Sequence, residues 1–484
     1  MTRGWLGVMA LAVLGSGHAS AHEAQAQVSA QDIQRFELRN ELIKEYPHIR
    51  KAMMHSPNAG FGGDSSPAVG YHMYSRTDQA AIDAVRAKLK VETYGEGTWL
   101  LRLPYVNIAV FETSDGLVLV DSGYAPAGPA LLETLRKLSR KPVHTIIYTH
   151  HHADHAFGAW ALLEAGEKPR IIAEESFLHE LGLDVRLANY TNVKLNDQAP
   201  QDVPRNLQDV VLPTETFRDK TTLTIGGEAF VLTHARGETA DHLWVHVPGR
   251  KVVVSADYHQ PFLVNAGNGK RRQRYALEWA GALRDMAATQ PALLLPMHGP
   301  AIAQPAQIQD RLTAMAEVLE SVDRQVVAGL NAGQRQDQVA AAVKLPPTLA
   351  GRPDMEEYYN RVQDIGKMVA REYSGWWDDI PSQWTPAPLE QQARELAALA
   401  GGVDKLAARS EALLASDPAM ACHLADWALF AAPDDPAVLR TVLKAYANRI
   451  QPGVPAQEIN VYLAHMSGVK QRLLQVSDPK RASQ

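Results

Sequence analysis

The chain has 484 residues, of which 46% are hydrophobic and 21% charged, a composition typical of a soluble globular protein with two or three domains. A formal net charge of −6 gives no reason to expect a nucleic-acid partner or a general affinity for membrane surfaces. The single cysteine, Cys422, excludes an intramolecular disulfide and a thiolate-rich metal site, so a bound metal would need His, Asp and Glu ligands.

The first 21 residues have the pattern of an export signal. Arg3 supplies the positive charge, and the apolar run from Trp5 to Leu14 is too short to span a bilayer. Ala19-Ser20-Ala21 is a small-residue cleavage site, and Ala24-Gln25-Ala26 is a second candidate. We therefore expect a signal peptide over residues 1–21, a periplasmic protein and no stable membrane anchor. The alternative is that the segment stays uncleaved as an anchor.

Residues 22–90 resemble a polar lead-in, with a helix at Ala30–Tyr46 and a Gly/Ser/Pro-rich loop at 56–70. From Val91 to about residue 305, short apolar runs alternate with helical segments, which predicts an α/β layered domain over 91–305. The predicted strands are 98–103, 106–112, 117–120, 144–148, 230–233, 243–247, 252–255 and 293–296, and helices are predicted at 129–140 and 157–163.

The strand at 144–148 leads directly into Thr149-His150-His151-His152-Ala153-Asp154-His155. Ligands at the C-terminal end of a strand lie where α/β folds place their chemistry. Four of these side chains, spaced by two, two and one residues, can point at two adjacent cations from one loop; they are His150, His152, Asp154 and His155. His151 is expected to point away. The alternative is an incidental His-rich surface loop.

Three more polar residues follow predicted strands. Glu238 comes after strand 230–233, Asp257 after 252–255, and His298 after 293–296. A polar residue beside a buried strand needs a partner in any case, but all three together with the loop at 150–155 complete a ligand set for two cations. His234, His242 and His259 flank the same strands and are expected to be structural.

A basic run, Lys270-Arg271-Arg272-Gln273-Arg274, follows Asp257 beside a loop that contains glycine and asparagine. An anionic substrate needs cations that are not metals, and one of Lys270, Arg271 or Arg272 could hold a sulfate or phosphate oxygen. The alternative is a solvated surface run.

After about residue 305 the pattern becomes helical, which predicts an all-α domain over 306–470 and a polar tail over 471–484. The helical segments are 310–330, 355–373, 388–400, 403–415, 420–430 and 435–449.

The spacing His150-x-His152-x-Asp154-His155 resembles the signature of the metallo-β-lactamase superfamily, whose members fold as an αββα sandwich and usually bind two zinc ions. That superfamily generally has a histidine where Glu238 follows Gly237, and a glutamate there resembles its alkylsulfatase branch. Several other stretches resemble the same branch: Arg274 to Trp279, Leu345-Pro346-Pro347, Tyr358-Tyr359, Tyr373, Gly375 to Asp379, and Ala398 to Gly402.

The resemblance implies an αββα sandwich followed by an all-α, dimerisation-like domain. It assigns His150, His152 and Glu238 to one zinc ion. Asp154, His155 and His298 then hold the second, Asp257 bridges the pair where the branch usually has a glutamate, and Asp154 and Asp257 are the expected catalytic carboxylates. Asp121, which follows strand 117–120, resembles the aspartate that braces the metal loop.

The implied function is an exported di-zinc hydrolase that cleaves a sulfate ester, because two close cations lower the pKa of a shared water toward ~7. The expected partners are a small anionic ester and a second copy of the chain, joined through the helical domain. Longer members of the branch carry a further sterol-carrier-like domain thought to hold the alkyl chain, and this chain stops at residue 484, which argues against long-chain substrates.

Three points stay open. Attack can fall on sulfur or on carbon. The same metal site could hydrolyse a β-lactam, a lactone or a phosphodiester, although Glu238 in place of a histidine argues against a typical β-lactamase. In a third interpretation the helical region binds a partner and the metal domain is a passenger.

Overall fold

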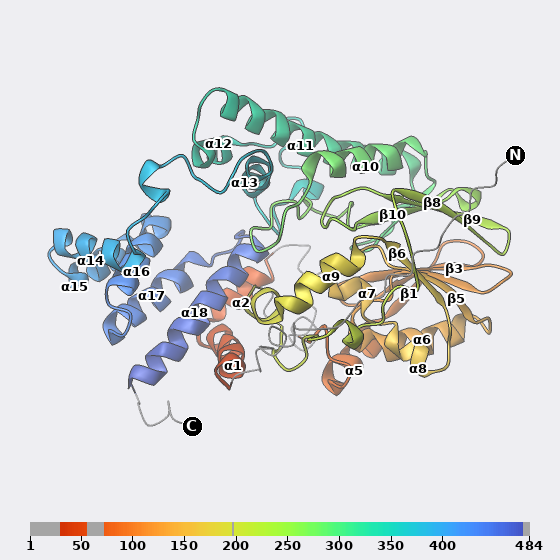
Figure 1. Ribbon diagram of the computed structural model, residues 1–484, viewed down its shortest axis with the longest axis horizontal. Helices are drawn as coiled ribbons and strands as arrows, with labels where there is room; N and C mark the ends of the chain where they lie inside the picture. The colour runs from red at the N-terminus through yellow and green to blue at the C-terminus, as the bar shows by residue number, and fades with distance from the viewer. Residues whose placement is uncertain (1–29, 56–71, 196–197, 478–484) are drawn as a thin grey trace, which may run out of the picture.

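The computed structural model describes residues 30–55, 72–195 and 198–477 (Figure 1). The predicted signal peptide and the Gly/Ser/Pro-rich loop at 56–70 lie outside the described residues. Among the helices that are described, none combines the length and the apolar character that a bilayer crossing requires.

Two β-sheets form the centre of the α/β half. The first has the order β1 (Lys90–Thr93), β2 (Thr98–Arg102), β3 (Asn107–Glu112), β4 (Leu117–Val120), β5 (Val143–Ile147), β6 (Arg170–Glu174) and β7 (Glu215–Phe217). Its strands are antiparallel from β1 to β4 and parallel from β4 to β7. The second has the order β12 (Leu293–Pro296), β11 (Val252–Ala256), β10 (Leu243–Val247), β9 (Glu228–His234) and β8 (Lys220–Ile225), and only β11 and β12 are parallel.

The two sheets pack face to face and share one hydrophobic core. Phe111 on β3 and Phe230 on β9, for example, meet edge to face with ring centroids 5.6 Å apart. The central strands are buried on both faces, as in the run Leu117 to Val120, which explains their continuous apolar sequence. Among the strands of the two sheets, those that sequence reasoning predicted are the most apolar.

Helices cover the outer faces of both sheets, so the layer order is αββα and the predicted fold class is confirmed (Figure 1). The first sheet is covered by α5 (Gln79–Lys88), α6 (Gly128–Leu138), α8 (Trp160–Glu164) and α9 (Phe177–Arg186), and the second by α10 (Ala276–Ala288) and α11 (Pro305–Asn331). Helix α6 illustrates why these helices cover a sheet, because it has one apolar side. Its residues Ala130, Leu131 and Leu135 are buried, while its last turn carries Arg136 and Lys137.

A second hydrophobic core holds the remaining helices together. It contains α14 (Leu389–Ala400), α15 (Val403–Leu413), α16 (Pro418–Ala431), α17 (Pro436–Arg449) and α18 (Ala456–Ser477), joined by the N-terminal helices α1 (Ala30–Glu45) and α2 (Pro47–Met53). Helices α12 (Gln336–Ala342) and α13 (Val362–Tyr373) pack with α11 instead and belong to the first core.

The two cores therefore divide between α13 and α14, and the domain boundary near residue 305 stays a prediction. The cores divide there because the apolar stripe of α11, including Leu312 and Leu319, packs into the core of the sheets. Two differences between the predicted and the observed elements concern helix ends. Helix α13 begins at Val362 instead of Met355, and α18 continues through residues 471–477, which were predicted as part of the polar tail.

Candidate metal centre

Six of the seven predicted ligands follow parallel strands: His150, His152, Asp154 and His155 come after β5, Asp257 after β11 and His298 after β12. Since β5 is parallel to β4 and β11 is parallel to β12, the loops after these strands open on the same side. The loop after β5 carries residues 150–155, with Asp154 and His155 on the short helix α7 (Ala153–Ala156). The backbone N–H of Leu243 at the start of β10 donates to the Thr149 carbonyl at 3.0 Å and joins the second sheet to this loop.

Asp154, His155, Asp257 and His298 form the tightest group of donors. His298 Nε2 lies 3.0 Å from Asp257 Oδ2 and 3.5 Å from Asp154 Oδ2. His155 Nε2 lies 3.3 Å from Asp154 Oδ2 and 3.5 Å from Asp257 Oδ1. Donor atoms of a tetrahedral zinc site at ~2.1 Å from the metal lie about 3.4 Å from one another, so these separations suit a metal ion.

The other predicted set is looser. His150 Nε2 lies 2.9 Å from His152 Nδ1, whereas His152 Nδ1 is 3.9 Å from Glu238 Oε1. His150 also shares a donor cluster with His155 and Asp257, all within 4.8 Å of one another. Asp257 therefore lies within reach of both sets, which is where a bridging carboxylate has to be. Burial and the neighbouring imidazoles hold the pKa of His150 and that of His152 well below the ordinary value, so both rings are neutral and can bind a metal.

The residues fit a metal for a second reason. His155 Nε2, Glu238 Oε2 and Asp257 Oδ1 are buried and have no hydrogen-bond partner among the described residues. Burying such groups without partners is costly, and orphaned donors and acceptors are rare in proteins. Three of them at one strand edge are explained if each faces a cation.

Asp121 braces the metal loop, as predicted. Its carboxylate accepts hydrogen bonds from the Thr149 backbone N–H at 2.7 Å and from the Thr149 hydroxyl at 2.9 Å, and its Oδ2 lies 2.8 Å from His155 Nδ1. This contact orients the other nitrogen of His155 toward the donor cluster. Asp121 adopts a φ of 64° and Ala256, just before Asp257, a φ of 47°, so backbone strain is concentrated at this edge.

Sequence reasoning did not assign two tyrosines to the site: Tyr105, which lies beside His298, and Tyr359, which contacts Tyr105. The His298 Nδ1–H donates to the carbonyl of Tyr105 at 2.8 Å, and Tyr105 has a φ of 88°. The hydroxyl oxygens of Tyr105 and Tyr359 are 2.9 Å apart, so the helical region that follows β12 reaches the metal centre through Tyr359. The adjacent pair Tyr358-Tyr359 was the only sequence signal, and it does not reveal this contact.

His151 points away from the ligands, as predicted, and has two acidic partners. Its Nδ1 lies 2.9 Å from Asp241 Oδ1 and its Nε2 3.5 Å from Asp184 Oδ2 on α9. Burial lowers the pKa of His151, but Asp241 and Asp184 outweigh burial and raise it to about 9. His151 thus connects the metal loop to α9 and to the turn that carries Glu238.

The turn at residues 236–242 is packed against β11. His242 stacks on Tyr258 with ring centroids 3.8 Å apart, and burial lowers the pKa of His242 to about 3. A Cβ on Gly237 would lie 2.9 Å from both the His242 ring and the Tyr258 ring, so only glycine fits directly before Glu238. His242 and His259 are both buried, and their structural role stays a prediction.

The three predicted anion-binding cations have different surroundings. Arg272 is engaged by α9, with its guanidinium 2.8 Å from Asp184 and 2.7 Å from Glu180. Arg271 lies near the metal centre, where it is one of the charges that lower the pKa of His152 after burial and His150. Its Nε is buried and has no hydrogen-bond partner in the part of the chain that the structure describes.

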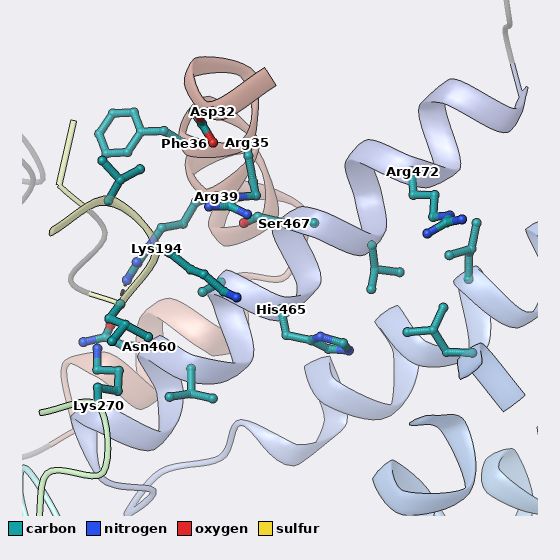
Figure 2. A pocket seen from close by; sticks show the side chains of 18 of the residues that line it. Asp32, Arg35, Phe36, Arg39, Lys194, Lys270, Asn460, His465, Ser467 and Arg472 are labelled. Atoms are coloured by element: carbon teal, nitrogen blue, oxygen red, sulfur yellow. Dashed lines mark hydrogen bonds between the residues drawn. The ribbon is translucent and has the colours of Figure 1, made fainter. Parts of the chain in front are cut away.

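Lys270 faces a separate cavity of about 700 Å³ between α1, α16, α18 and the segment around residue 194. Figure 2 shows Lys194, Lys270 and Asn460 on one side of this cavity, with His465 and Arg472 further along α18. None of the predicted metal ligands lines it. Lys270 therefore has a different environment from that of Arg271, although the two are adjacent in sequence.

Comparison with known proteins identifies both halves of the chain. Residues 101–298 match the metallo-β-lactamase superfamily and residues 335–471 match the alkyl sulfatase dimerisation family. A linear primary-alkylsulfatase from a Pseudomonas strain is 30% identical over 353 residues, which cover 67% of each chain. An alkyl/aryl-sulfatase of Saccharomyces cerevisiae is 21% identical over 69% of this chain and 56% of its own length.

A comparison of structures also finds an alkylsulfatase. The stereoselective inverting sec-alkylsulfatase Pisa1 from Pseudomonas sp. superimposes with a TM-score of 0.69 at 18% identity, covering 91% of this chain and 78% of that one. The αββα core, the helical region after it and the sequence matches agree with one another. The chain therefore belongs to the alkylsulfatase family of the metallo-β-lactamase superfamily, a superfamily of hydrolases whose members are typically metal-dependent.

Proposed function

We propose that this protein hydrolyses a sulfate ester at a site that holds two zinc ions. The observation that carries the proposal is the cluster of His155, Asp257 and His298, in which His155 Nε2 and Asp257 Oδ1 are buried without a hydrogen-bond partner among the described residues, next to a second set that includes Glu238. Membership of the alkylsulfatase family supports the substrate class. The ligands, as predicted from the sequence, are His150, His152 and Glu238 for one ion, and Asp154, His155 and His298 for the other, with Asp257 between them.

A bound zinc pair would supply Lewis acidity and hydroxide at neutral pH. The chain's own residues set the rest of the chemistry. Asp121 and the Tyr105 carbonyl hold the far nitrogens of His155 and His298, so both imidazoles keep one orientation. Asp154 and Asp257 bring negative charge to the reacting position and are the proposed catalytic carboxylates.

Arg271 is the residue we propose to hold the sulfate group. Its positive charge lowers the pKa of His152 and that of Glu238, after burial and other charges, and its buried Nε suits an anionic oxygen. Arg272 is already bound by two carboxylates, and Lys270 faces the cavity between α1 and α18. This arrangement favours Arg271 over its two neighbours.

The contact between Tyr359 and Tyr105 argues against a passenger metal domain, because residues on both sides of β12 build the same site. We further propose that the protein forms a homodimer through the region that matches the dimerisation family. Export through residues 1–21 to the periplasm is also proposed, and the first residue of the mature protein, His22 if cleavage follows Ala21, tests it.

The test is sulfate release by the purified protein from short and long, primary and secondary alkyl sulfates, with and without a chelator. We expect chelator-sensitive release that zinc restores. Asp154→Ala should lower kcat/KM at least about a hundredfold, while Asp337→Ala, at an exposed carboxylate on α12, should leave it unchanged.

Two results would contradict the proposal. Near-normal release by Asp154→Ala would rule out the assignment of the metal ligands. No release by a protein that holds about two zinc ions per chain would shift the substrate class to lactones, β-lactams or phosphodiesters.

A further inference from the structure

The cavity that Lys270 faces shares no lining residue with the predicted metal centre. The predicted ligands, all of which the structure describes, are not among the residues that line it, and neither are Arg271 and Arg272. Its volume of about 700 Å³ falls in the range of pockets that bind small molecules. It is bounded by α1, by residues 193–195 of the α/β half and by α16, α17 and α18. A molecule in this cavity therefore need not contact the metals.

The lining of this cavity carries an excess of positive charge. Among the lining residues that the structure describes, five are Arg or Lys and two are Asp or Glu. Arg35 and Arg39 on α1 face the cavity together with Lys194, which follows α9 (Figure 2). Arg39 is only 3% exposed and donates to the Asn460 side-chain oxygen at 2.7 Å, so its guanidinium is held in the cavity wall. Cations gathered in a partly enclosed space attract an anion more strongly than exposed cations do.

Helices α16, α17 and α18 contribute most of the apolar lining. The residues are Leu429, Phe430, Leu439, Val461, Ala464 and Val469. Val461 is 45% exposed, and a Cβ on Gly468 would meet only the Cδ of Arg35 among the described atoms, at 3.9 Å. This wall thus has apolar side chains with open space in front of them. An alkyl chain placed there would bury its CH₂ groups, which is favourable.

We propose that this cavity binds a single-chain anionic amphiphile, with the head group near Arg35, Arg39 and Lys194 and the alkyl chain along α16 and α18. An anionic head complements the excess of cations, and an apolar tail complements the helices. The size of the cavity suits a free small molecule rather than a membrane surface. Such a site depends neither on zinc nor on ester cleavage, so it goes beyond the proposed function.

Isothermal titration calorimetry of the purified, zinc-loaded protein with decyl sulfonate, below its micelle concentration, tests the proposal. Decyl sulfonate has a carbon–sulfur bond in place of the ester, so it cannot be hydrolysed as a sulfate ester. Octyl sulfonate, which is shorter by two CH₂ groups, should bind about 15-fold more weakly. Decanoate should bind within about tenfold of decyl sulfonate, whereas decyltrimethylammonium should bind at least about tenfold more weakly because its head group is repelled.

Substitutions in the cavity locate the bound molecule. Lys194→Glu reverses a charge near the head group and Ala464→Trp fills space along α18, and each should weaken the binding of decyl sulfonate at least about tenfold. The matched controls, Lys405→Glu on α15 and Ala288→Trp at the end of α10, change exposed residues outside the cavity and should alter binding less than about threefold. Should Ala464→Trp not fold, Val461→Glu, at an exposed residue of the cavity, should weaken binding by the same factor.

Decyl sulfonate also resembles the proposed substrate, so binding at the metal centre has to be distinguished. Asp154→Ala should keep the binding of decyl sulfonate within about threefold, and Lys194→Glu and Ala464→Trp should keep kcat/KM for a short alkyl sulfate within about threefold. Absent sulfate release with normal binding would contradict the proposed function alone. The cavity site would be overturned if decyl sulfonate does not bind, if Asp154→Ala abolishes binding, or if binding survives both cavity substitutions. Equal binding of decyltrimethylammonium would overturn the anionic head group.

Discussion

Arg271 and Arg272 are neighbours in sequence with different partners, so they provide a matched pair at the residue scale. Arg271→Met should raise KM for a sulfate ester about 10- to 100-fold, since a hydrogen bond to a charged group is worth about 1.5–3 kcal/mol. Inhibition by inorganic sulfate should weaken by a similar factor, with kcat much less affected. Steady-state kinetics with each substrate checks both effects.

Arg272→Met is the control. It removes the contacts with Glu180 and Asp184 on α9, so it should lower the melting temperature while changing KM less than about threefold. If Arg272→Met raises KM as much as Arg271→Met does, the assignment of the anion to Arg271 is wrong.

Sequence reasoning located the candidate ligands because each one follows an apolar strand, and strand ends are where α/β folds gather polar groups. It could not choose among Lys270, Arg271 and Arg272, since adjacent residues in a loop point in unrelated directions. It also missed the contact between Tyr105 and Tyr359, which are 254 positions apart. Such partners are set by tertiary packing, and no local pattern encodes them.

At the scale of elements, a buried aspartate joins α11 to the turn that leads toward Tyr359. Asp354 is buried and lies 2.6 Å from Arg311 on α11 and 2.8 Å from Arg352. Burial raises the pKa of Asp354, but hydrogen bonds from Arg352 and Arg311 outweigh burial and hold that pKa below its usual value. Asp354→Asn should therefore lower the free energy of unfolding by about 2 kcal/mol at pH 7.

The pH dependence has a definite sign. A carboxyl group with a depressed pKa stabilises the fold above the pKa of an unfolded aspartate, about 3.9, and that stabilisation is lost as the pH falls below it. The difference between wild type and Asp354→Asn in urea unfolding should shrink below about pH 4. Asp310→Asn, an exposed partner of the same Arg352, should cost less than about 1 kcal/mol at pH 7. An effect of Asp354→Asn that is equal at pH 7 and pH 3.5 would contradict this account.

Element prediction succeeded where apolar runs were long and failed where polar residues interrupt them. Strand β8 has the burial pattern of a half-exposed strand, with Lys220 and Thr222 exposed, and β6 is a short run directly after Pro169. Asp154 and His155 were expected in a loop before the helix, but they form the short helix α7. Helix α18 was not among the predicted helical segments, and its residues 471–477 were assigned to the tail because they are polar, although α1 packs against this helix.

At the scale of the whole molecule, the segment of residues 374–388 links α13 to α14 (Figure 1) and carries an exposed aromatic cluster. Trp376 is 75% exposed, and the centroid of its ring lies 5.2 Å from that of the Trp384 ring. Large exposed aromatic groups mark protein interfaces, and tryptophan is among the residues that contribute most to them. The segment lies within the match to the dimerisation family, so a second copy of the chain is its expected partner.

The substitutions Trp376→Ser and Trp384→Ser together should convert the proposed homodimer into a monomer, because each removes a large apolar side chain from a shared interface. Sedimentation velocity at micromolar concentration measures the change. Leu187→Ser and Leu277→Ser, at two exposed apolar residues of the α/β half, form the control pair and should leave the dimer intact. Since the metal centre is built by residues of the first core and by Tyr359, the monomer should keep its zinc. A dimer that survives both tryptophan substitutions would move the interface elsewhere on the helical region, and a monomeric wild type would overturn the proposed assembly.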